Sequence, residues 1–341
     1  TSVKVDEAPD GTRRERQTQS IAIGDGIQYT KLTANPVITA DMLPEGSSLV
    51  DFRDPKIWKD QDTYYVVVGS RNEDGSGQIA LFSSKNVVEW QFEKILAYCH
   101  NTYGKMWECP DFFPLNQQYV LIVSPQQIKA KNLELHNGNN SVYFIGDFNK
   151  ENLEYTMDKA YQIDFGMDFY APQTMQTPDG RRIMIGWLQN WDNYLTPGDM
   201  KWSGIMTIPR ELSIKDNRLI QNPVRELAHY YGEKTAYQNV RIREQDGIVA
   251  LENVKGRSFD MTIALLSGEF ESFSILLATN KDHKTQLIYD KRKGIFTTDR
   301  TYSGMEKDTL SIRSMPVNKD KLCKIRVLMD KYTIEQARSE E

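Results

Sequence analysis

Residues 51–58 read DFRDPKIW, and two later segments repeat their pattern: WECPDFF at 107–113 and DFYAPQT at 168–174. Each segment couples an acidic residue to a nearby proline and to aromatic residues. A polar turn, a strongly apolar strand and further strands follow each of them. The interval of roughly 55 to 60 residues is close to the repeat length of a four-stranded propeller blade. We therefore predict three successive blades of a β-propeller.

Strand signals continue outside these three segments. Short runs rich in Val, Ile, Tyr and Phe recur between clusters of Gly, Asn, Asp and Pro, which is typical of strands. The runs within the repeats are 63–68, 78–83, 118–123, 141–145, 182–187 and 218–221. Before the first repeat, residues 16–24 and 27–32 are predicted as outer strands of a further blade whose inner strands are absent. No stretch keeps a 3.6-residue apolar period for a dozen residues, so we expect a mostly β protein.

The pattern changes near residues 223–231. The strands predicted beyond this point, among them SFDMTIALL, KTQLIYD and CKIRVLM, alternate at shorter spacing, as in a β-sandwich. We therefore divide the chain into a propeller domain at 1–228 and a sandwich domain at 229–341. We expect the first to be incomplete at its N-terminus and the second at its C-terminus. No low-complexity linker separates them, so the two domains are expected to pack closely.

Composition limits the classes of function. The chain has 341 residues, 39% hydrophobic and 26% charged, which is ordinary for a soluble globular protein. Its net charge of −5 gives no reason to expect nucleic acid or an anionic membrane as partner. Cys99, Cys109 and Cys323 are too few for a disulfide framework and fit a reducing compartment, so we expect a cytoplasmic location. The scattered histidines predict no metal site, and no cofactor is expected.

Acidic residues in the repeats indicate a type of chemistry. The innermost strand of each propeller blade lines the central channel, so residues at equivalent positions converge there. We interpret Asp54 and Glu108 as such a pair. Glycoside hydrolysis needs paired carboxylates, one to protonate the leaving oxygen and one to attack the anomeric carbon or activate water. The aromatic residues predicted to stack on sugar are Phe52, Trp58, Trp107, Phe112, Phe169 and Tyr170.

A structural alternative remains open at this point. Asp and Glu beside proline are also turn-formers at the starts of strands. For one motif alone this alternative is the better interpretation, but three motifs in register favour a shared pocket. The residue pattern by itself leaves an enzyme pocket and a structural repeat about equally supported.

The motifs FRDP and WECPDFF resemble the signatures of glycoside hydrolase family 32, which includes invertases, levanases, inulinases and sucrose-6-phosphate hydrolases. The resemblance implies a five-bladed β-propeller followed by a β-sandwich, with the three full repeats as its last three blades. It extends over nearly the whole chain, through SPQ at 124–126, GDF at 146–148, DFGMDFYAPQT at 164–174, RRIMIGW at 181–187, WSGIMTIPREL at 202–212, NPVREL at 222–227 and DRTYSG at 299–304.

The same resemblance implies roles for individual residues. Glu108 is the expected general acid/base, and Asp54 is expected to bind fructose hydroxyls and stabilise the transition state. Arg53 would orient the substrate and partly balance the carboxylate charge. Asp168 and Trp202 are weaker candidates for lining the pocket, since Asp168 could hold a blade turn and Trp202 could fill core. Cys109 is expected to be a packing residue.

The nucleophile is expected to be absent from the chain. The family's nucleophile is an aspartate in an Asn-Asp-Pro-Asn motif on the innermost strand of the first blade. The chain contains no such motif, and its single Asp-Pro pair is Asp54-Pro55. Asp10 lies in a predicted polar turn and is a poor substitute. We therefore expect that an upstream segment is missing and that little retaining catalysis remains.

The expected substrate class is a β-fructoside: sucrose, sucrose 6-phosphate or short fructans. SPQ at 124–126 and the stretch 136–148 favour the intracellular sucrose-6-phosphate hydrolases. Phosphate selection would need a basic group, with Lys129, Lys131 and Lys201 as candidates. Residues 129–140 are predicted to form an extended polar loop over the pocket mouth. The alternatives are a non-catalytic sugar-binding protein derived from the family, a fructan hydrolase, and a propeller enzyme acting on arabinose polymers.

Overall fold

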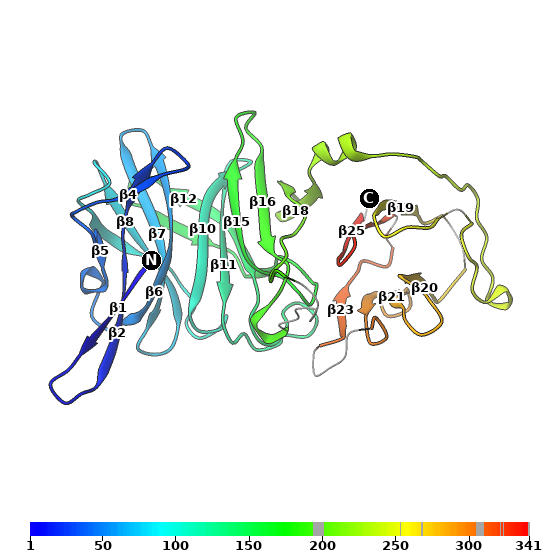
Figure 1. Ribbon diagram of the computed structural model, residues 1–341, viewed down its shortest axis with the longest axis horizontal. Coiled ribbons are helices and arrows are strands. Elements are labelled where there is room, and N and C mark those ends of the chain that lie inside the picture. The colour runs from blue at the N-terminus through cyan, green and yellow to red at the C-terminus, as the bar shows by residue number, and fades with distance from the viewer. Residues whose placement is uncertain are drawn as a thin grey trace.

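The fold is all-β, as predicted, and consists of two lobes placed along the long axis of the molecule (Figure 1). The computed structural model describes residues 1–193, 201–252, 254–266, 269–304, 310–320, 322 and 324–339. The first lobe holds the repeats and the second holds the predicted sandwich strands. None of the helices in these ranges is long and apolar enough to cross a membrane.

Each of the three repeats begins one antiparallel sheet, in which consecutive strands are neighbours. The first sheet has the order β6 (Ser47–Asp60), β7 (Thr63–Asn72), β8 (Gly77–Ser84) and β9 (Gln91–Tyr98). The second has the order β10 (Trp107–Leu115), β11 (Gln118–Pro125), β12 (Val142–Asn149) and β13 (Glu154–Met157), with β14 (Tyr161–Gln162) also on β12. The third has the order β15 (Tyr170–Gln176), β16 (Arg182–Trp187), β17 (Arg210–Lys215) and β18 (Arg218–Pro223). This meander order is the one expected of propeller blades.

The N-terminal strands differ from the prediction. A three-stranded sheet has the order β1 (Ser2–Glu7), β2 (Arg13–Gln19) and β5 (Ile38–Thr39), while β3 (Ala22–Gly24) and β4 (Tyr29–Lys31) form a separate hairpin. Residues 16–24, predicted as one strand, are thus divided between β2 and β3. The sequence analysis missed β1, because its alternating Val3 and Val5 stand among charged residues and are themselves exposed. A short 3₁₀ turn, η1 (Ala40–Met42), follows β5.

The core lies between neighbouring sheets. Trp107 of β10 is fully buried in a cluster with Leu81 of the first sheet and Phe144 of the second. Strand β8 is buried at nearly every position, because both of its faces are covered. Leu135 of the 129–140 segment also belongs to this cluster, and backbone bridges Ile128–Gly138 and Lys131–Leu135 fold that segment back on itself. The segment was predicted to be extended, but it is folded back on itself.

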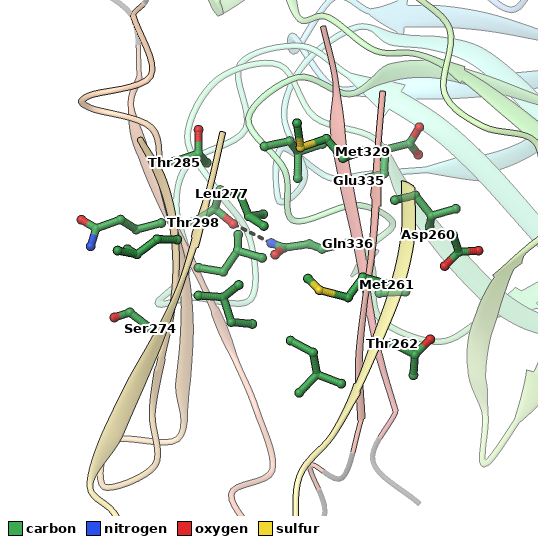
Figure 2. A pocket seen from close by; sticks show the side chains of 18 of the residues that line it. Asp260, Met261, Thr262, Ser274, Leu277, Thr285, Thr298, Met329, Glu335 and Gln336 are labelled. Atoms are coloured by element: carbon green, nitrogen blue, oxygen red, sulfur yellow. Dashed lines mark hydrogen bonds between the residues drawn. The ribbon is translucent and has the colours of Figure 1, made fainter. Parts of the chain in front are cut away.

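The second lobe is a sandwich of two sheets. One has the order β19 (Phe259–Ala264), β24 (Lys324–Met329) and β25 (Ile334–Ser339), and the other the order β20 (Ser272–Leu277), β21 (Thr285–Asp290), β22 (Ile295–Asp299) and β23 (Ile312–Pro316). Their facing side chains enclose Leu287, Tyr289 and Val327. Figure 2 shows the pocket between the two sheets, where Gln336 of β25 donates a hydrogen bond across it to Thr298 of β22.

The two lobes are joined by a long connection. It begins with η3 (Arg225–Tyr230), contains the short turn η4 (Glu244–Asp246) and arcs around the sandwich before β19 (Figure 1). A further 3₁₀ turn, η2 (Trp191–Asn193), lies in the third blade. The proposed boundary between residues 228 and 229 falls inside η3 and stays a prediction.

Candidate active site

The first strand of each blade carries a β-bulge at the same place in its repeat. The register against the next strand shifts between Arg53 and Lys56, between Glu108 and Asp111, and between Tyr170 and Gln173. Each bulge contains a residue with positive φ followed by proline: Asp54 at 63°, Cys109 at 49° and Ala171 at 50°. A non-glycine residue in this region costs about 1–3 kcal/mol, and such strain concentrates at functional sites.

The bulges correct the alignment of the repeats. Asp54 is equivalent to Cys109, so the interpretation of Asp54 and Glu108 as equivalent positions was wrong by one residue. Glu108 is instead equivalent to Arg53, and both immediately precede a bulge. The third member of this row is Tyr170. Aligning the repeats by their acidic residues hid this register, which the prolines that follow Asp54, Cys109 and Ala171 mark instead.

The three residues before the bulges form one hydrogen-bonded row with Glu108 at its centre. Oε1 of Glu108 accepts a hydrogen bond from Nε of Arg53 at 2.9 Å and lies 2.8 Å from Nη2. Oε2 accepts a hydrogen bond from the hydroxyl of Tyr170 at 2.7 Å. The Glu108 side chain is 13% exposed. Each carboxylate oxygen is therefore held by a donor from a different neighbouring blade.

Arg53 is itself held by acceptors on two sides. Its Nη1 donates to Asp51 Oδ1 at 2.9 Å and to Gln17 Oε1 of β2 at 3.3 Å. Burial disfavours the guanidinium charge, but hydrogen bonds and charges of Asp51 and Glu108 outweigh burial and raise the pKa of Arg53. Asp51 also pairs with Nη2 of Arg71 at 2.6 Å. Arg53 is thus a fixed positive charge beside Glu108.

Asp54 lies on the other side of the same bulge. Its Oδ2 accepts a hydrogen bond from the backbone N–H of Cys109 at 3.0 Å and lies 3.5 Å from the Cys109 Sγ. Burial, followed by the charge of Asp54, raises the pKa of the Cys109 thiol, so the thiol stays protonated and donates. Cys109 therefore holds the Asp54 carboxylate in addition to the packing role predicted for it. The structure brings Arg53, Asp54 and Glu108 together, as the sequence predicted.

Tyr170 is the site residue whose role the sequence analysis missed. Its ring is 2% exposed, and its hydroxyl lies 2.9 Å from the carbonyl oxygen of Ser124 as well as beside Glu108. Burial, followed by the charge of Glu108, raises the pKa of Tyr170, so its hydroxyl keeps its proton. The available signal was its place one residue before Ala171-Pro172, which matches that of Glu108 before Cys109-Pro110.

A second polar row follows the prolines and ties the same three strands together. Nζ of Lys56 lies 3.3 Å from Asp111 Oδ2 and donates to the Thr174 carbonyl at 2.7 Å. Asp111 Oδ2 accepts a hydrogen bond from the Thr174 N–H at 2.6 Å. Burial raises the pKa of Asp111 despite the opposing charge of Lys56. These contacts fix the spacing of β6, β10 and β15 next to the row Arg53–Glu108–Tyr170.

The aromatic residues predicted to stack on sugar are mostly core residues, so that prediction was wrong. Five of them are buried between the blades: Phe52, Trp107, Phe112, Phe169 and Tyr170. The sixth, Trp58, stacks on Tyr65 with 5.4 Å between ring centroids. Side chains alternate along a strand, so Phe52 and Trp107 point away from the side that carries Arg53 and Glu108.

The two weaker candidates have contacts with the sandwich. Asp168 forms an ion pair with Arg300, which follows β22. Trp202 is about half exposed and meets the edge of Tyr332, in the turn between β24 and β25, with 6.0 Å between centroids. Asp168 thus pairs with the sandwich rather than within a blade turn, and Trp202 does not fill core. Their part in lining a pocket stays a prediction.

The lysines predicted as phosphate-binding candidates lie at the surface. Lys129, Lys131 and Lys201 are all exposed, and Lys131 lies 3.9 Å from the carboxylate of Glu134. Within the described ranges, no group of three His, Cys, Asp or Glu side chains is arranged to hold a metal ion.

Comparison with known sequences identifies the family. Residues 3–223 match the glycosyl hydrolases family 32 N-terminal domain, and residues 226–336 match the family 32 C-terminal domain. The chain belongs to glycoside hydrolase family 32. The resemblance stated from FRDP and WECPDFF is thereby confirmed.

Curated relatives include bacterial sucrose-6-phosphate hydrolases. The Escherichia coli protein is 31% identical over 322 residues, which cover 94% of this chain and 64% of that protein. The Bacillus subtilis protein is 38% identical over 228 residues, covering 64% of this chain and 46% of that protein. The chain thus spans less than two thirds of the length of these relatives.

Solved structures of the family share the fold. The sucrose-6-phosphate hydrolase of Lactobacillus gasseri superposes with a TM-score of 0.82 at 23% identity, covering 99% of this chain and 69% of that one. A mutant Bombyx mori GH32 beta-fructofuranosidase in complex with sucrose gives a TM-score of 0.77 at 26% identity, covering 99% and 68%. The predicted propeller followed by a sandwich is confirmed by this likeness.

Proposed function

We propose that the chain is the acid/base-bearing part of a retaining β-fructofuranosidase that releases fructose from sucrose or sucrose 6-phosphate. The observation that carries the proposal is the row Arg53–Glu108–Tyr170 with Asp54 beside it. The names of the relatives support the substrate class. A cytoplasmic location, inferred from the few cysteines, is part of the same proposal.

The environment of Glu108 suits a group that alternates between acid and base. The Tyr170 hydroxyl lies between two acceptors, Glu108 Oε2 at 2.7 Å and Ser124 O at 2.9 Å, and has one proton to donate. When Glu108 is ionised, Tyr170 donates to it. When Glu108 carries its proton on Oε2, Tyr170 accepts that proton's hydrogen bond and donates to Ser124 O instead. Both protonation states are therefore satisfied by one hydroxyl.

Arg53 and Asp54 have complementary roles in this proposal. The Arg53 guanidinium neutralises Glu108 after the proton has been given to the leaving oxygen. Asp54, with one carboxylate oxygen held by Cys109, is proposed to accept hydrogen bonds from fructose hydroxyls. Its negative charge would stabilise the positive charge that develops on the fructosyl ring in the oxocarbenium-like transition state.

The nucleophile is the part of the mechanism that these residues do not supply. The 341 residues contain no Asn-Asp-Pro-Asn sequence. Without a carboxylate to attack the anomeric carbon, a retaining mechanism cannot form its glycosyl-enzyme intermediate. We therefore expect hydrolysis by the complete gene product and little or none by the 341-residue chain alone.

The first experiment measures, for both proteins, the release of fructose from sucrose, sucrose 6-phosphate and inulin, and the release of arabinose from arabinan. Release from sucrose or its 6-phosphate by the complete product supports the proposal, and the ratio of the two kcat/KM values defines the branch. Preferential release from inulin would favour a fructan hydrolase. Release of arabinose from arabinan, or no release of sugar from any substrate, would contradict the proposed β-fructofuranosidase activity.

The acid/base assignment has its own test in an active protein. Glu108→Gln keeps an oxygen that can accept the hydrogen bond from Arg53, but the amide cannot give or take the proton. We therefore expect kcat on sucrose to fall by about 10² or more. Glu151→Gln, at an exposed glutamate, is the matched control and should keep full activity. Normal turnover in Glu108→Gln would refute the role of Glu108.

A non-catalytic sugar-binding protein is the second candidate. The missing Asn-Asp-Pro-Asn sequence favours it, whereas the retention of Glu108 and Asp54 favours the enzyme. Titration calorimetry with sucrose separates them. A complete gene product that binds sucrose but does not hydrolyse it would select this alternative.

A further inference from the structure

The segment that leads into Tyr170 is held by the sandwich domain at two points. The first is Arg300, immediately after β22. Its Nη1 donates to Oδ2 of Asp168 and its Nη2 donates to Oδ1 at 3.3 Å, so two nitrogens meet two carboxylate oxygens. The side chains are 15% and 24% exposed. A fork of this kind fixes the orientation of a carboxylate as well as its distance.

Arg300 is held in place by its own domain. Its Nε and Nη2 donate to the carbonyl oxygen of Leu310 at 3.3 and 3.1 Å. Its backbone N–H donates to the carbonyl of Ser311 at 2.8 Å. Because the guanidinium is already oriented by the sandwich, the contact transmits the position of that domain to Asp168.

The second point of attachment lies at the start of the same segment. Arg210 of β17 donates to Asp164 Oδ2 at 2.7 Å and to Glu335 Oε2 of β25 at 2.9 Å. The Arg210 guanidinium also lies over the ring of Phe169, 5.1 Å from its centroid. Residues 164 and 169 therefore share an arginine that a sandwich carboxylate holds.

The path from Asp168 to the catalytic row is short. Asp168 is two residues before Tyr170, whose hydroxyl holds Glu108 Oε2. The intervening Phe169 is packed so closely on Gly186 that a Cβ there would lie 2.7 Å from the ring. A rigid segment of this length carries a displacement at Asp168 to Tyr170 with little loss.

We propose that Arg300 of the sandwich is a positioning residue for the general acid/base, acting through Asp168 and Tyr170. This inference rests on the proposed function of Glu108. The sandwich, on this proposal, helps to orient the group that protonates the leaving oxygen. A displacement of about 1 Å at a catalytic group can lower a rate by about 100-fold.

The test compares two substrates of different leaving-group acidity in the active, complete gene product. Arg300→Gln should lower kcat/KM on sucrose by about 10-fold, because glucose must be protonated as it leaves. It should change kcat/KM on fructofuranosyl fluoride by less than about 2-fold, because kcat/KM reports departure of the leaving group and fluoride leaves with little help from an acid. Asp168→Asn should give the same pattern, and Arg300→Lys should recover part of the loss on sucrose.

Arg326→Gln is the matched control. Arg326 also meets a carboxylate with two nitrogens, at 2.9 and 2.5 Å from Asp260, but this pair lies within the sandwich. Arg326→Gln should leave the turnover of both substrates unchanged. Equal losses on the two substrates in Arg300→Gln, or a loss on sucrose no greater than that of Arg326→Gln, would overturn the inference.

A second readout does not depend on activity. Amide hydrogen exchange in residues 164–171 should be faster in Arg300→Gln than in Arg326→Gln. If the unsubstituted protein releases no fructose, the proposed function fails, and the exchange rates alone decide whether Arg300 holds this segment. Identical exchange in the two variants would then overturn the positioning role.

Discussion

The Tyr170 hydroxyl has two acceptors within reach and is buried where water cannot replace it. The sequence points to Glu108 through its motif, whereas Tyr170 resembles any other aromatic residue on a strand. Its importance follows from the row that the three bulges create. The dependence of Glu108 on this one hydroxyl can be tested directly.

Tyr170→Phe removes the hydroxyl and keeps the ring. Glu108 Oε2 and Ser124 O then lose their shared donor, so the free energy of unfolding should fall by about 1–2 kcal/mol. In an active protein, kcat on sucrose should fall about 10-fold with KM little changed, because the lost contact acts on the acid/base rather than on bound sugar. Tyr29→Phe, at an exposed tyrosine, is the control. Unchanged kcat in Tyr170→Phe would contradict the proton-sharing role.

His136 provides a second prediction for a single residue. Burial, assisted by the charge of Arg313, lowers the pKa of His136 from 6.5 to about 4. Its Nε2 is buried and has no hydrogen-bond partner among the residues that the structure describes. Between these two pKa values the unfolded chain binds more protons than the folded one, so stability falls as the pH falls from 6.5 to 4. Below pH 4 the effect no longer grows.

His136→Leu should remove this part of the acid sensitivity. The melting temperature of the variant should fall less than that of the parent between pH 6.5 and 4. The ring is partly solvated, so the difference should correspond to only about 1 kcal/mol. The control is His229→Leu, at an exposed histidine of η3. If the melting temperatures of the parent and of His136→Leu fall by the same amount between pH 6.5 and 4, the effect is excluded.

At the scale of elements, the site depends on the close approach of β7 to β10. A Cβ built at Gly69 of β7 would lie 2.2 Å from the carbonyl oxygen of Trp107 and 3.2 Å from that of Arg53. Gly69 is paired with Arg53, and Trp107 directly precedes Glu108. The absence of a side chain at Gly69 therefore lets the first and second blades bring Arg53 and Glu108 together.

Gly69→Ala should push β7 and β10 apart, because the added methyl group would meet the backbone carbonyl of Trp107, which cannot rotate away as a side chain can. We expect a loss of about 1–3 kcal/mol in the free energy of unfolding, measured by urea denaturation. Gly232→Ala is the control, since nothing lies within 4 Å of its Cβ, and it should stay within about 0.5 kcal/mol of the parent. A Gly69→Ala variant as stable as the control would mean that the blades relax without cost.

At the scale of the whole molecule, Arg210 joins the two lobes. It is held by Asp164 of the propeller and Glu335 of the sandwich, which also accepts the backbone N–H of Ile208 at 2.7 Å. Burial raises the pKa of Glu335, and the charge of Arg210 opposes this effect. The domains therefore meet through buried, paired charges.

Glu335→Gln keeps the acceptor for Ile208 but removes the charge that faces Arg210. Loss of a buried partner typically costs about 3–5 kcal/mol, and Asp164 remains, so we expect about 1–3 kcal/mol. Calorimetry should then separate one unfolding transition into two, because the lobes lose part of their coupling. Glu226→Gln, which breaks a more exposed pair with Arg181, should leave the free energy of unfolding nearly unchanged. A single, unshifted transition in Glu335→Gln would contradict this coupling.

The sequence alone determined the features that depend on local chemistry. The alternation of buried and partly exposed side chains along β21, and the turn residues between strands, are patterns that span only a few residues. Such patterns predicted most strands of the blades and of the sandwich. Strands with few apolar residues, such as β1 and β23, were missed because their local pattern is weak. The motifs around Asp54 and Glu108 identified the acid/base candidate and its family.

Only the tertiary structure decided how these residues act on one another. Arg53 and Glu108 are 55 residues apart in sequence, and Asp168 and Arg300 are 132 apart. Their contacts depend on the packing of whole sheets, on the bulges at Asp54, Cys109 and Ala171, and on the docking of the sandwich. The prolines mark where the bulges lie, but residue type does not encode which partner from another sheet a side chain meets. The row Arg53–Glu108–Tyr170 and the attachment of its supporting segment to the sandwich therefore exist only in the folded chain.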